Sequence, residues 1–335
     1  MFVPLIPVRW LQHWFLVGLV LCFALGSVAA SHLATWADQK IWQHLVVAAV
    51  MFCMALPIEF AVVRGVLQRP LAPLLASSIN LGLAPLCVWP WLAWSQGELA
   101  LGFAVLAATP CTLASAAVWT RRAGGNEVVA VMVTLLTNLA SCWLLPAWLA
   151  VLTTRSAAGP ELGSIVGLLW WIVVVPILLA QVARRIPRVQ RWAVRRQPWL
   201  SVFCQLGILS IVLVGAVKMA LRLAQAHSPA LGFPELLGCG VLALGLHGFM
   251  FYCGIRSAHW LRLPRGEQWA VGFSGSQKTL MVGLTVAIEL GFSIIPLVMY
   301  HVLQLIADTL LADYLRRRYP PAGMPAASIV PPGGR

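Results

Sequence analysis

Lys278 is the residue whose type and position say most about chemistry in this sequence. It lies about halfway along an apolar stretch, residues 268–290. A lysine at the centre of a membrane-spanning helix costs roughly 2.5–3.5 kcal/mol, so its side chain should face a cavity or a polar partner. Ser274, Ser276 and Gln277 place hydroxyl and amide groups beside it. We expect an ion- or substrate-binding site here; the alternative is a lysine that only joins helices.

Other polar side chains recur at helical spacing in neighbouring apolar stretches. Hydroxyl and amide groups of this kind can hold sodium or a substrate, although they also serve in ordinary helix packing. The candidates around Pro110 and on the following helix are Thr109, Thr112, Ser115, Thr134 and Asn138. Asn80 and His247 are weaker candidates, each alone in its stretch.

A further set of polar residues lies on one face of the last predicted helix: His301, Gln304 and Asp308, spaced i, i+3 and i+7. At about 1.5 Å per residue, Gln304 should lie level with Lys278 and Asp308 about one turn nearer the end of the span. This depth allows an ion pair between Lys278 and Asp308, which could take up or release a proton.

The elements that position these residues follow from composition. The chain has 335 residues, of which 60% are hydrophobic and 10% charged, with a mean hydropathy of +0.86. Soluble domains carry about 25% charged residues, so we expect an all-α polytopic membrane protein. Ten apolar stretches are long enough to be spans: 12–31, 41–63, 71–94, 99–120, 128–152, 163–183, 199–222, 235–255, 268–290 and 293–315.

The basic residues set the expected orientation. Of the 23, 18 lie at alternate ends of the apolar stretches, and cytoplasmic loops are the ones enriched in Lys and Arg. We expect a multi-pass protein of the plasma (inner) membrane with both termini cytoplasmic, partnered by lipid and not by nucleic acid. Residues 320–335 are rich in Pro and Gly and should be a disordered tail. Arg9 before an apolar run also fits a cleaved signal peptide, but signal peptides have shorter runs.

The ten stretches form two sets of five, residues 1–152 and 153–319. An odd number per set gives the two sets opposite orientations, as in transporters built from inverted repeats. The fourth stretch of each set is interrupted, by Pro110 in the first and by Gly272, Gly275 and polar residues at mid-depth in the second. Paired interruptions of this kind indicate a binding site, because unwound backbone is tolerated only beside a cavity or within protein.

The segments ATPCTLASAAVWTRRAGGN (108–126), TLLTN (134–138), GFSGSQKTLMVG (272–283) and PLVMYHVLQL (296–305) resemble the bile acid:sodium symporter superfamily, in its divergent SBF-like branch. The resemblance implies a panel domain and a core domain, with discontinuous helices 4 and 9 crossing near the bilayer midplane at the substrate and ion sites. It also implies that Ser115, Thr134, Asn138 and Gln277 match sodium-binding positions.

Three departures from the family pattern alter this expectation. Phe273 stands where sodium-coupled members have Glu, Lys278 where they have Asn, and Ala116 where they have a second Asn. An ammonium at Lys278 could replace the cation, so sodium dependence should be weak or absent. Its charge favours an organic anion, bile-acid-like or another amphipathic carboxylate, as substrate of a secondary active transporter. No cofactor other than sodium is suggested.

Other functions remain open. Transport could be proton-coupled or uncoupled through Lys278 and Asp308, or the protein could be a non-transporting regulator of ion homeostasis. Residues 272–275 also form a GxSG string, which suggests an intramembrane serine hydrolase with His301 as base. Ser274 and His301 differ in depth by roughly 12 Å, so we expect no enzyme.

Overall fold

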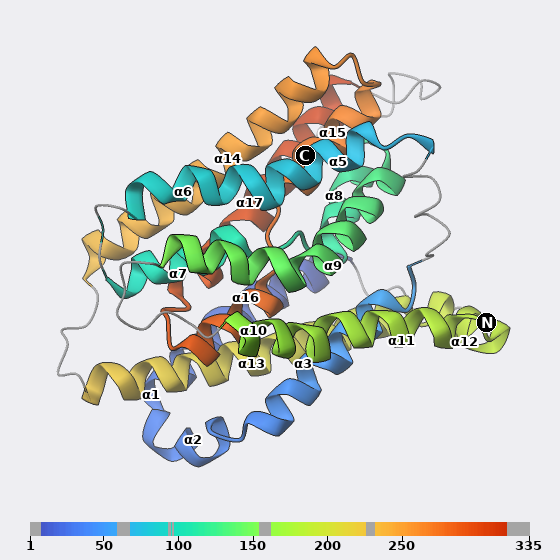
Figure 1. Ribbon diagram of the computed structural model, residues 1–335. Helices are drawn as coiled ribbons and strands as arrows, with labels where there is room; N and C mark the ends of the chain where they lie inside the picture. Colours follow the sequence, from blue (N-terminus) through green and yellow to red (C-terminus); the bar gives the residue numbers. More distant parts are fainter. Residues whose placement is uncertain are drawn as a thin grey trace, which may run out of the picture.

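The computed structural model describes residues 8–58, 68–92, 95, 97–153, 162–225 and 232–319, and these are all-helical without a strand (Figure 1). The helices are α1 Val8–Val28, α2 Ala30–Ala37, α3 Lys40–Ala55, α5 Leu71–Ser78, η1 Ile79–Leu83, α6 Ala84–Leu92, α7 Glu98–Ala108, α8 Ser115–Arg122, α9 Glu127–Leu152, α10 Leu162–Leu169, η2 Trp170–Val174, α11 Val175–Arg184, α12 Pro187–Arg195, α13 Gln197–Gln225, α14 Phe233–Trp260, α15 Arg265–Ser276, α16 Leu280–Leu290 and α17 Ile295–Arg318. The elements η1 and η2 are single π-helical turns.

Helices occupy all ten stretches predicted from hydropathy. Within the described residues, six helices are long and apolar enough to cross a membrane, or seven if α1 and α2, bent by 101°, count as one. The remaining stretches fall short for local reasons. α7 and α8 are separated by a break, as are α15 and α16, and α3 ends at Ala55 after 16 residues. The predicted tail, 320–335, lies outside the described residues.

The helices pack in two groups that do not follow the two halves of the sequence. α1, α3, α11 and α13 pack together in the lower part of Figure 1, and α5 to α9 pack with α14, α15 and α17 in the upper part. η2 contacts both α3 and α9, and α16 contacts both α13 and α17, so the two groups are joined. Each half of the chain contributes helices to both groups.

The outer surface carries large apolar side chains, as expected of helices that face lipid. Val28, Ile41 and Phe233 are 87%, 79% and 76% exposed. Water-facing surfaces rarely expose extended apolar patches, and a hydrocarbon environment removes that cost. Together with the long apolar helices, this surface marks a multi-pass membrane protein.

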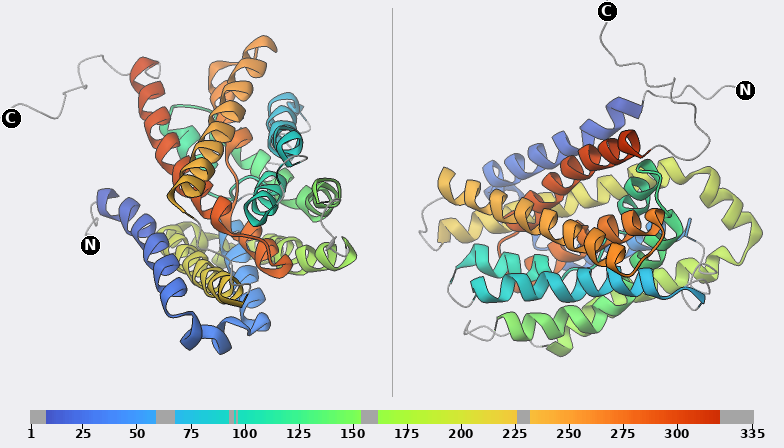
Figure 2. Two further views of the ribbon diagram at one scale, coloured as in Figure 1. Left: turned by 90° about the vertical axis from the view of Figure 1, so that its left-hand side faces the viewer. Right: turned by 90° about the horizontal axis from the view of Figure 1, so that it is seen from above.

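Charged contacts gather at the two ends of the molecule. At one end, Arg122 donates to Asp313 through Nε at 2.7 Å and Nη2 at 2.9 Å, joining the end of α8 to that of α17. At the other, Lys40 donates to Glu289 at 2.8 Å. The right view of Figure 2 shows the start of α1, the end of α17 and α12 towards the same end of the molecule. The arginine-rich segments therefore share one end, as their alternation in the sequence predicts.

The first predicted interruption is confirmed, and the second lies at the polar residues of its stretch and not at the glycines. α7 ends at Ala108 because Thr109 is extended before Pro110, which disfavours the helical conformation of its predecessor. α15, however, continues through Gly272 and Gly275 and ends at Ser276. Gly272 instead allows α15 to pack closely against α14, since a Cβ at Gly254 of α14 would lie 3.0 Å from the Gly272 Cα. The break lies at residues 277–279.

The polar segment between residues 184 and 198 is helical rather than a simple loop. Its helix, α12, begins at Pro187, whose fixed φ suits the first turn, and buries Ala193. The segment turns the chain from α11 into α13 and exposes most of its arginines.

Candidate functional site

The two helix breaks contact each other directly. The Thr279 amide donates to the Pro110 carbonyl at 2.8 Å. The hydroxyls of Thr112 and Ser115 both donate to Gln277 Oε1, at 2.7 and 2.8 Å. Residues 165 positions apart in the sequence thus satisfy each other's polar groups where helical hydrogen bonds are missing.

Lys278 is buried at this junction and is held by main-chain carbonyls. Its side chain is 1% exposed. Nζ donates to the carbonyl oxygens of Asn80 at 2.6 Å, Ala107 at 2.7 Å and Thr109 at 2.8 Å. The three acceptors match the three protons of an ammonium group. No carboxylate in the described part of the chain forms an ion pair with Lys278.

Each of these carbonyls is available because a helix is irregular there. Ala107 and Thr109 lie at the end of α7, where carbonyls lack helical donors and the helix dipole is negative. In η1, the Ala84 amide bonds to Ile79 instead of Asn80. The next residue, Pro85, has no N–H, so the Asn80 carbonyl remains free for Lys278.

Gln304 holds the main chain of Lys278. Its Oε1 accepts from the Lys278 amide and its Nε2 donates to the Lys278 carbonyl, both at 2.9 Å. His301 Nδ1 lies 2.9 Å from the same Nε2. The expected equal depth of Gln304 and Lys278 is therefore confirmed, and the amide replaces the hydrogen bonds that the broken helix lost.

Lys278 and Asp308 do not pair, contrary to the sequence-based expectation. Asp308 accepts from the Gln277 amide and lies 3.0 Å from His247 Nε2, with both partners of this buried pair at most 1% exposed. The lysine side chain instead extends towards η1 and α7. The predicted depth of Lys278 was right, but the predicted direction of its side chain was wrong, because His247 of α14 already pairs with Asp308.

Asn80 ties η1 to the second break. Its Nδ2 donates to the carbonyls of Ser274 at 3.2 Å, Gly275 at 3.3 Å and Gln277 at 2.7 Å. Its main-chain carbonyl holds Lys278. Asn80, which appeared weak in the sequence, thus contacts both the last turn of α15 and the break itself. π-helical turns often occur at functional sites, and this one carries Asn80.

The predicted sodium ligands lie near one another but are largely occupied by hydrogen bonds. Gln277 Oε1 accepts from two hydroxyls, and Thr134 Oγ1 donates to the Thr112 carbonyl at 2.9 Å. Asn138 Nδ2 donates to the Cys111 carbonyl at 2.9 Å, while its buried Oδ1 has no hydrogen-bond partner. The remaining acceptors are neutral, namely Asn138 Oδ1 and hydroxyl lone pairs, and no carboxylate in the set balances an ion's charge, so in this conformation the set fits a sodium ion poorly.

The remaining candidates take local roles. The hydroxyl of Ser274 donates to the Ala270 carbonyl, and that of Ser276 to the Gly272 carbonyl at 2.9 Å. Neither bonds to His301, whose Nδ1 meets Gln304. The geometry therefore does not assemble the nucleophile and base that the GxSG string suggested.

Two buried residues of the network were underrated or overlooked in the sequence. His247 partners Asp308, and Tyr300 donates to the Ser276 carbonyl at 2.6 Å, with its hydroxyl 3.5 Å from His247 Nδ1. A line of polar groups thus runs from Tyr300 through His247, Asp308 and Gln277 to the first break. Tyr300 lies four residues before Gln304 on α17, and that spacing was an available signal.

An all-helical membrane protein in which two broken helices meet at a buried cation belongs among the transporter-like membrane proteins. The chain matches the SBF-like CPA transporter family over residues 13–317 and belongs to that family, which confirms the resemblance.

Three relatives illustrate the range of the match. "Putative symporter YfeH" of Escherichia coli is 27% identical over 223 residues, covering 65% of either chain. "Uncharacterized protein PA2026" of Pseudomonas aeruginosa is 27% identical over 310 residues, covering 90% of this chain and 84% of that one. "Sodium/bile acid cotransporter 7" of Mus musculus is 24% identical over 209 residues, covering 60% of this chain and 61% of that one. Less than two thirds of YfeH and of the mouse protein is matched.

Proposed function

We propose that this protein is a secondary active transporter of an organic anion, working by alternating access without a requirement for sodium. The observation that carries the proposal is the Lys278 ammonium, held by three carbonyls where two helix breaks meet. In this view, ten spans form two inverted five-helix repeats in the plasma (inner) membrane, with both termini cytoplasmic and breaks near the bilayer midplane.

Lys278 acts in this proposal as a resident cation. It occupies a cage of main-chain oxygens of the kind that cation-selective sites use. It also leaves a positive charge close to the transport path, which favours an amphipathic carboxylate over a cation. The names of the mouse and Escherichia coli relatives, a sodium/bile acid cotransporter and a symporter, support a transport role and bile acids as the first probes.

Uptake into proteoliposomes tests the proposal, with radiolabelled taurocholate and a set of aromatic and aliphatic carboxylates as probes. Uptake by the wild type should change less than about twofold when choline or potassium replaces sodium. Lys278→Ala should lower uptake at least tenfold, and Lys278→Asn should make it sodium-stimulated. Strict sodium dependence of the wild type contradicts the proposal, and binding of probes without flux favours a non-transporting regulator.

A second candidate is proton coupling, favoured by the buried His247–Asp308 pair and its link to Gln277. A proton on this pair would weaken its attraction and change what Gln277 bonds at the break. Asp308→Asn should abolish any stimulation of uptake by a pH gradient. Asp313→Asn, on the same helix but paired with Arg122 at the surface, is the matched control. Unchanged stimulation in Asp308→Asn rules this candidate out.

A further inference from the structure

A cluster of arginines at one end of the molecule has no acidic partner in the described residues. This basic cluster consists of Arg188, Arg191, Arg195 and Arg196, all exposed. Three of them follow i, i+3 and i+7 on α12. The sequence contains no Asp or Glu between Glu161 and Glu235. None of the four joins an ion pair within the described part, and Arg191 Nε donates only to the Pro187 carbonyl, at 3.2 Å. The cluster therefore presents positive charge without a counterion.

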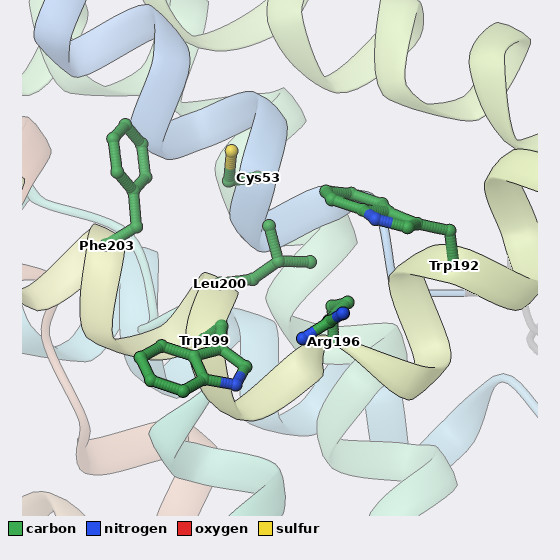
Figure 3. A pocket seen from close by; sticks show the side chains of 6 residues that line it. All are labelled: Cys53, Trp192, Arg196, Trp199, Leu200 and Phe203. Carbon is green, nitrogen blue, oxygen red and sulfur yellow. The ribbon is translucent and has the colours of Figure 1, made fainter.

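Two adjoining cavities flank this cluster. The first, of about 290 Å³, is lined by the four arginines and Trp192. The second, of about 360 Å³, is lined by Cys53, Trp192, Arg196, Trp199, Leu200 and Phe203. Figure 3 shows Arg196 between the two tryptophan side chains, with Cys53 contributed by α3. Trp192 and Arg196 border both cavities, so a cationic pocket opens beside an apolar groove.

We propose that this pocket and groove form a binding site for an anionic phospholipid. The phosphate would lie on the basic cluster, and one acyl chain would lie along Trp199, Leu200 and Phe203. Guanidinium groups pair with phosphate oxygens through parallel hydrogen bonds. Tryptophan favours the depth of lipid headgroups, and basic pockets at helix ends bind such headgroups.

The apolar groove decides between a lipid and a free anion. Inorganic phosphate would use the arginines but gain nothing from the groove, whereas a phospholipid uses both. The four guanidinium groups carry four positive charges, whereas a phosphodiester carries one negative charge. A lipid with two phosphates should accordingly bind more tightly than a lipid with one. The site is formed by α12, the start of α13 and Cys53 of α3, none of which contributes to the carbonyl cage of Lys278, and the inference does not depend on transport.

Lipid binding can be measured on the full-length protein by native mass spectrometry after titration with dioleoyl phosphatidylglycerol, cardiolipin or phosphatidylcholine. Each basic residue near a membrane surface contributes about fivefold in affinity, so R188Q/R191Q/R195Q should weaken phosphatidylglycerol binding on the order of 100-fold. The matched control is R316Q/R317Q/R318Q, which removes the same charge from the exposed end of α17. Equal weakening in the two triple variants, or no preference of the wild type for anionic lipid, overturns the proposal.

A second pair of variants tests the groove without changing charge. Cys53→Phe should fill the groove and lower the affinity for dioleoyl phosphatidylglycerol about tenfold. The affinity for dihexanoyl phosphatidylglycerol, which has the same headgroup and much shorter acyl chains, should stay the same. Cys87→Phe is the control, because Cys87 is also half-buried but lies on α6. If inorganic phosphate competes as well as the lipid at equal concentration, or Cys53→Phe changes nothing, the site is one for free anions and the lipid assignment is wrong.

Discussion

A lysine buried away from water normally requires a carboxylate, yet Lys278 is held by three main-chain oxygens. Removing one partner from a buried charged group is costly, because the remaining groups lose their hydrogen bonds without regaining water. In this protein the acceptors come from a helix end next to Pro110 and from a π-helical turn next to Pro85. Lys278 therefore compensates for two defects of the helical framework at once.

Replacing this side chain should destabilise the protein as well as impair its function. Lys278→Met keeps most of the volume but leaves the carbonyls of Asn80, Ala107 and Thr109 without a donor, and should cost about 3–5 kcal/mol. Lys40→Met, at an exposed ion pair, should cost less than about 1 kcal/mol. Thermal unfolding in detergent measures both. A melting temperature of Lys278→Met equal to that of Lys40→Met contradicts the structural role.

A neighbouring pair of residues in one helix tests the polar network. Asn80→Ala removes three hydrogen bonds to the second break and should lower stability by about 1–3 kcal/mol. Ser77→Ala removes a buried hydroxyl that has no hydrogen-bond partner, and should be neutral or stabilising. The same unfolding assay compares them. If Ser77→Ala is as destabilising as Asn80→Ala, any truncation at this site lowers stability, and the lost hydrogen bonds of Asn80 are not the cause.

At the scale of elements, the broken helices are fixed by close contacts as much as by hydrogen bonds. A Cβ at Gly102 of α7 would lie 2.4 Å from the Ser293 carbonyl oxygen, which belongs to the chain just before α17. Gly102→Ala should thus force α7 and α17 apart and cost about 1–3 kcal/mol. Gly245→Ala, in open space on α14, should instead stabilise by up to about 1 kcal/mol. Opposite signs in chemical denaturation are the expected outcome, and a stabilising Gly102→Ala would refute the close packing.

The sequence allowed much of this arrangement to be predicted. Hydropathy located the helices, and Pro110 located the first break because proline acts on its own chain neighbours. The second break was assigned to the glycines as well as to the polar residues, because a glycine permits either unwinding or close packing, and only the contact of Gly272 with Gly254 decides. The direction of the Lys278 side chain depended on His247 taking Asp308, a contact between helices that periodicity does not reveal.

For the molecule as a whole, helices of both sequence halves form each packing group, and the group of α5 to α9 with α14, α15 and α17 encloses the buried cation Lys278. The net charge is +13, and the start of α1, the end of α17 and α12 lie towards one end of the molecule (Figure 2), whereas Lys278 bonds to the carbonyls of Asn80, Ala107 and Thr109 at the helix breaks. We propose that the basic cluster, on α12 and at Arg196 just after it, binds lipid, and that Lys278 serves transport at the helix breaks. Function in this account comes from the second, and the first affects how the protein sits in its membrane.

The most direct test of the account is a sodium titration of thermal stability, because it needs no substrate. Wild type and Lys278→Asn are unfolded in detergent at constant ionic strength while sodium replaces potassium. A ligand that binds the native state at 100 times its dissociation constant stabilises by about 2.7 kcal/mol. We predict no sodium-specific shift for the wild type and a rise in melting temperature for Lys278→Asn. A sodium-specific rise in the wild type would contradict the claim that the ammonium of Lys278 takes the place of the ion.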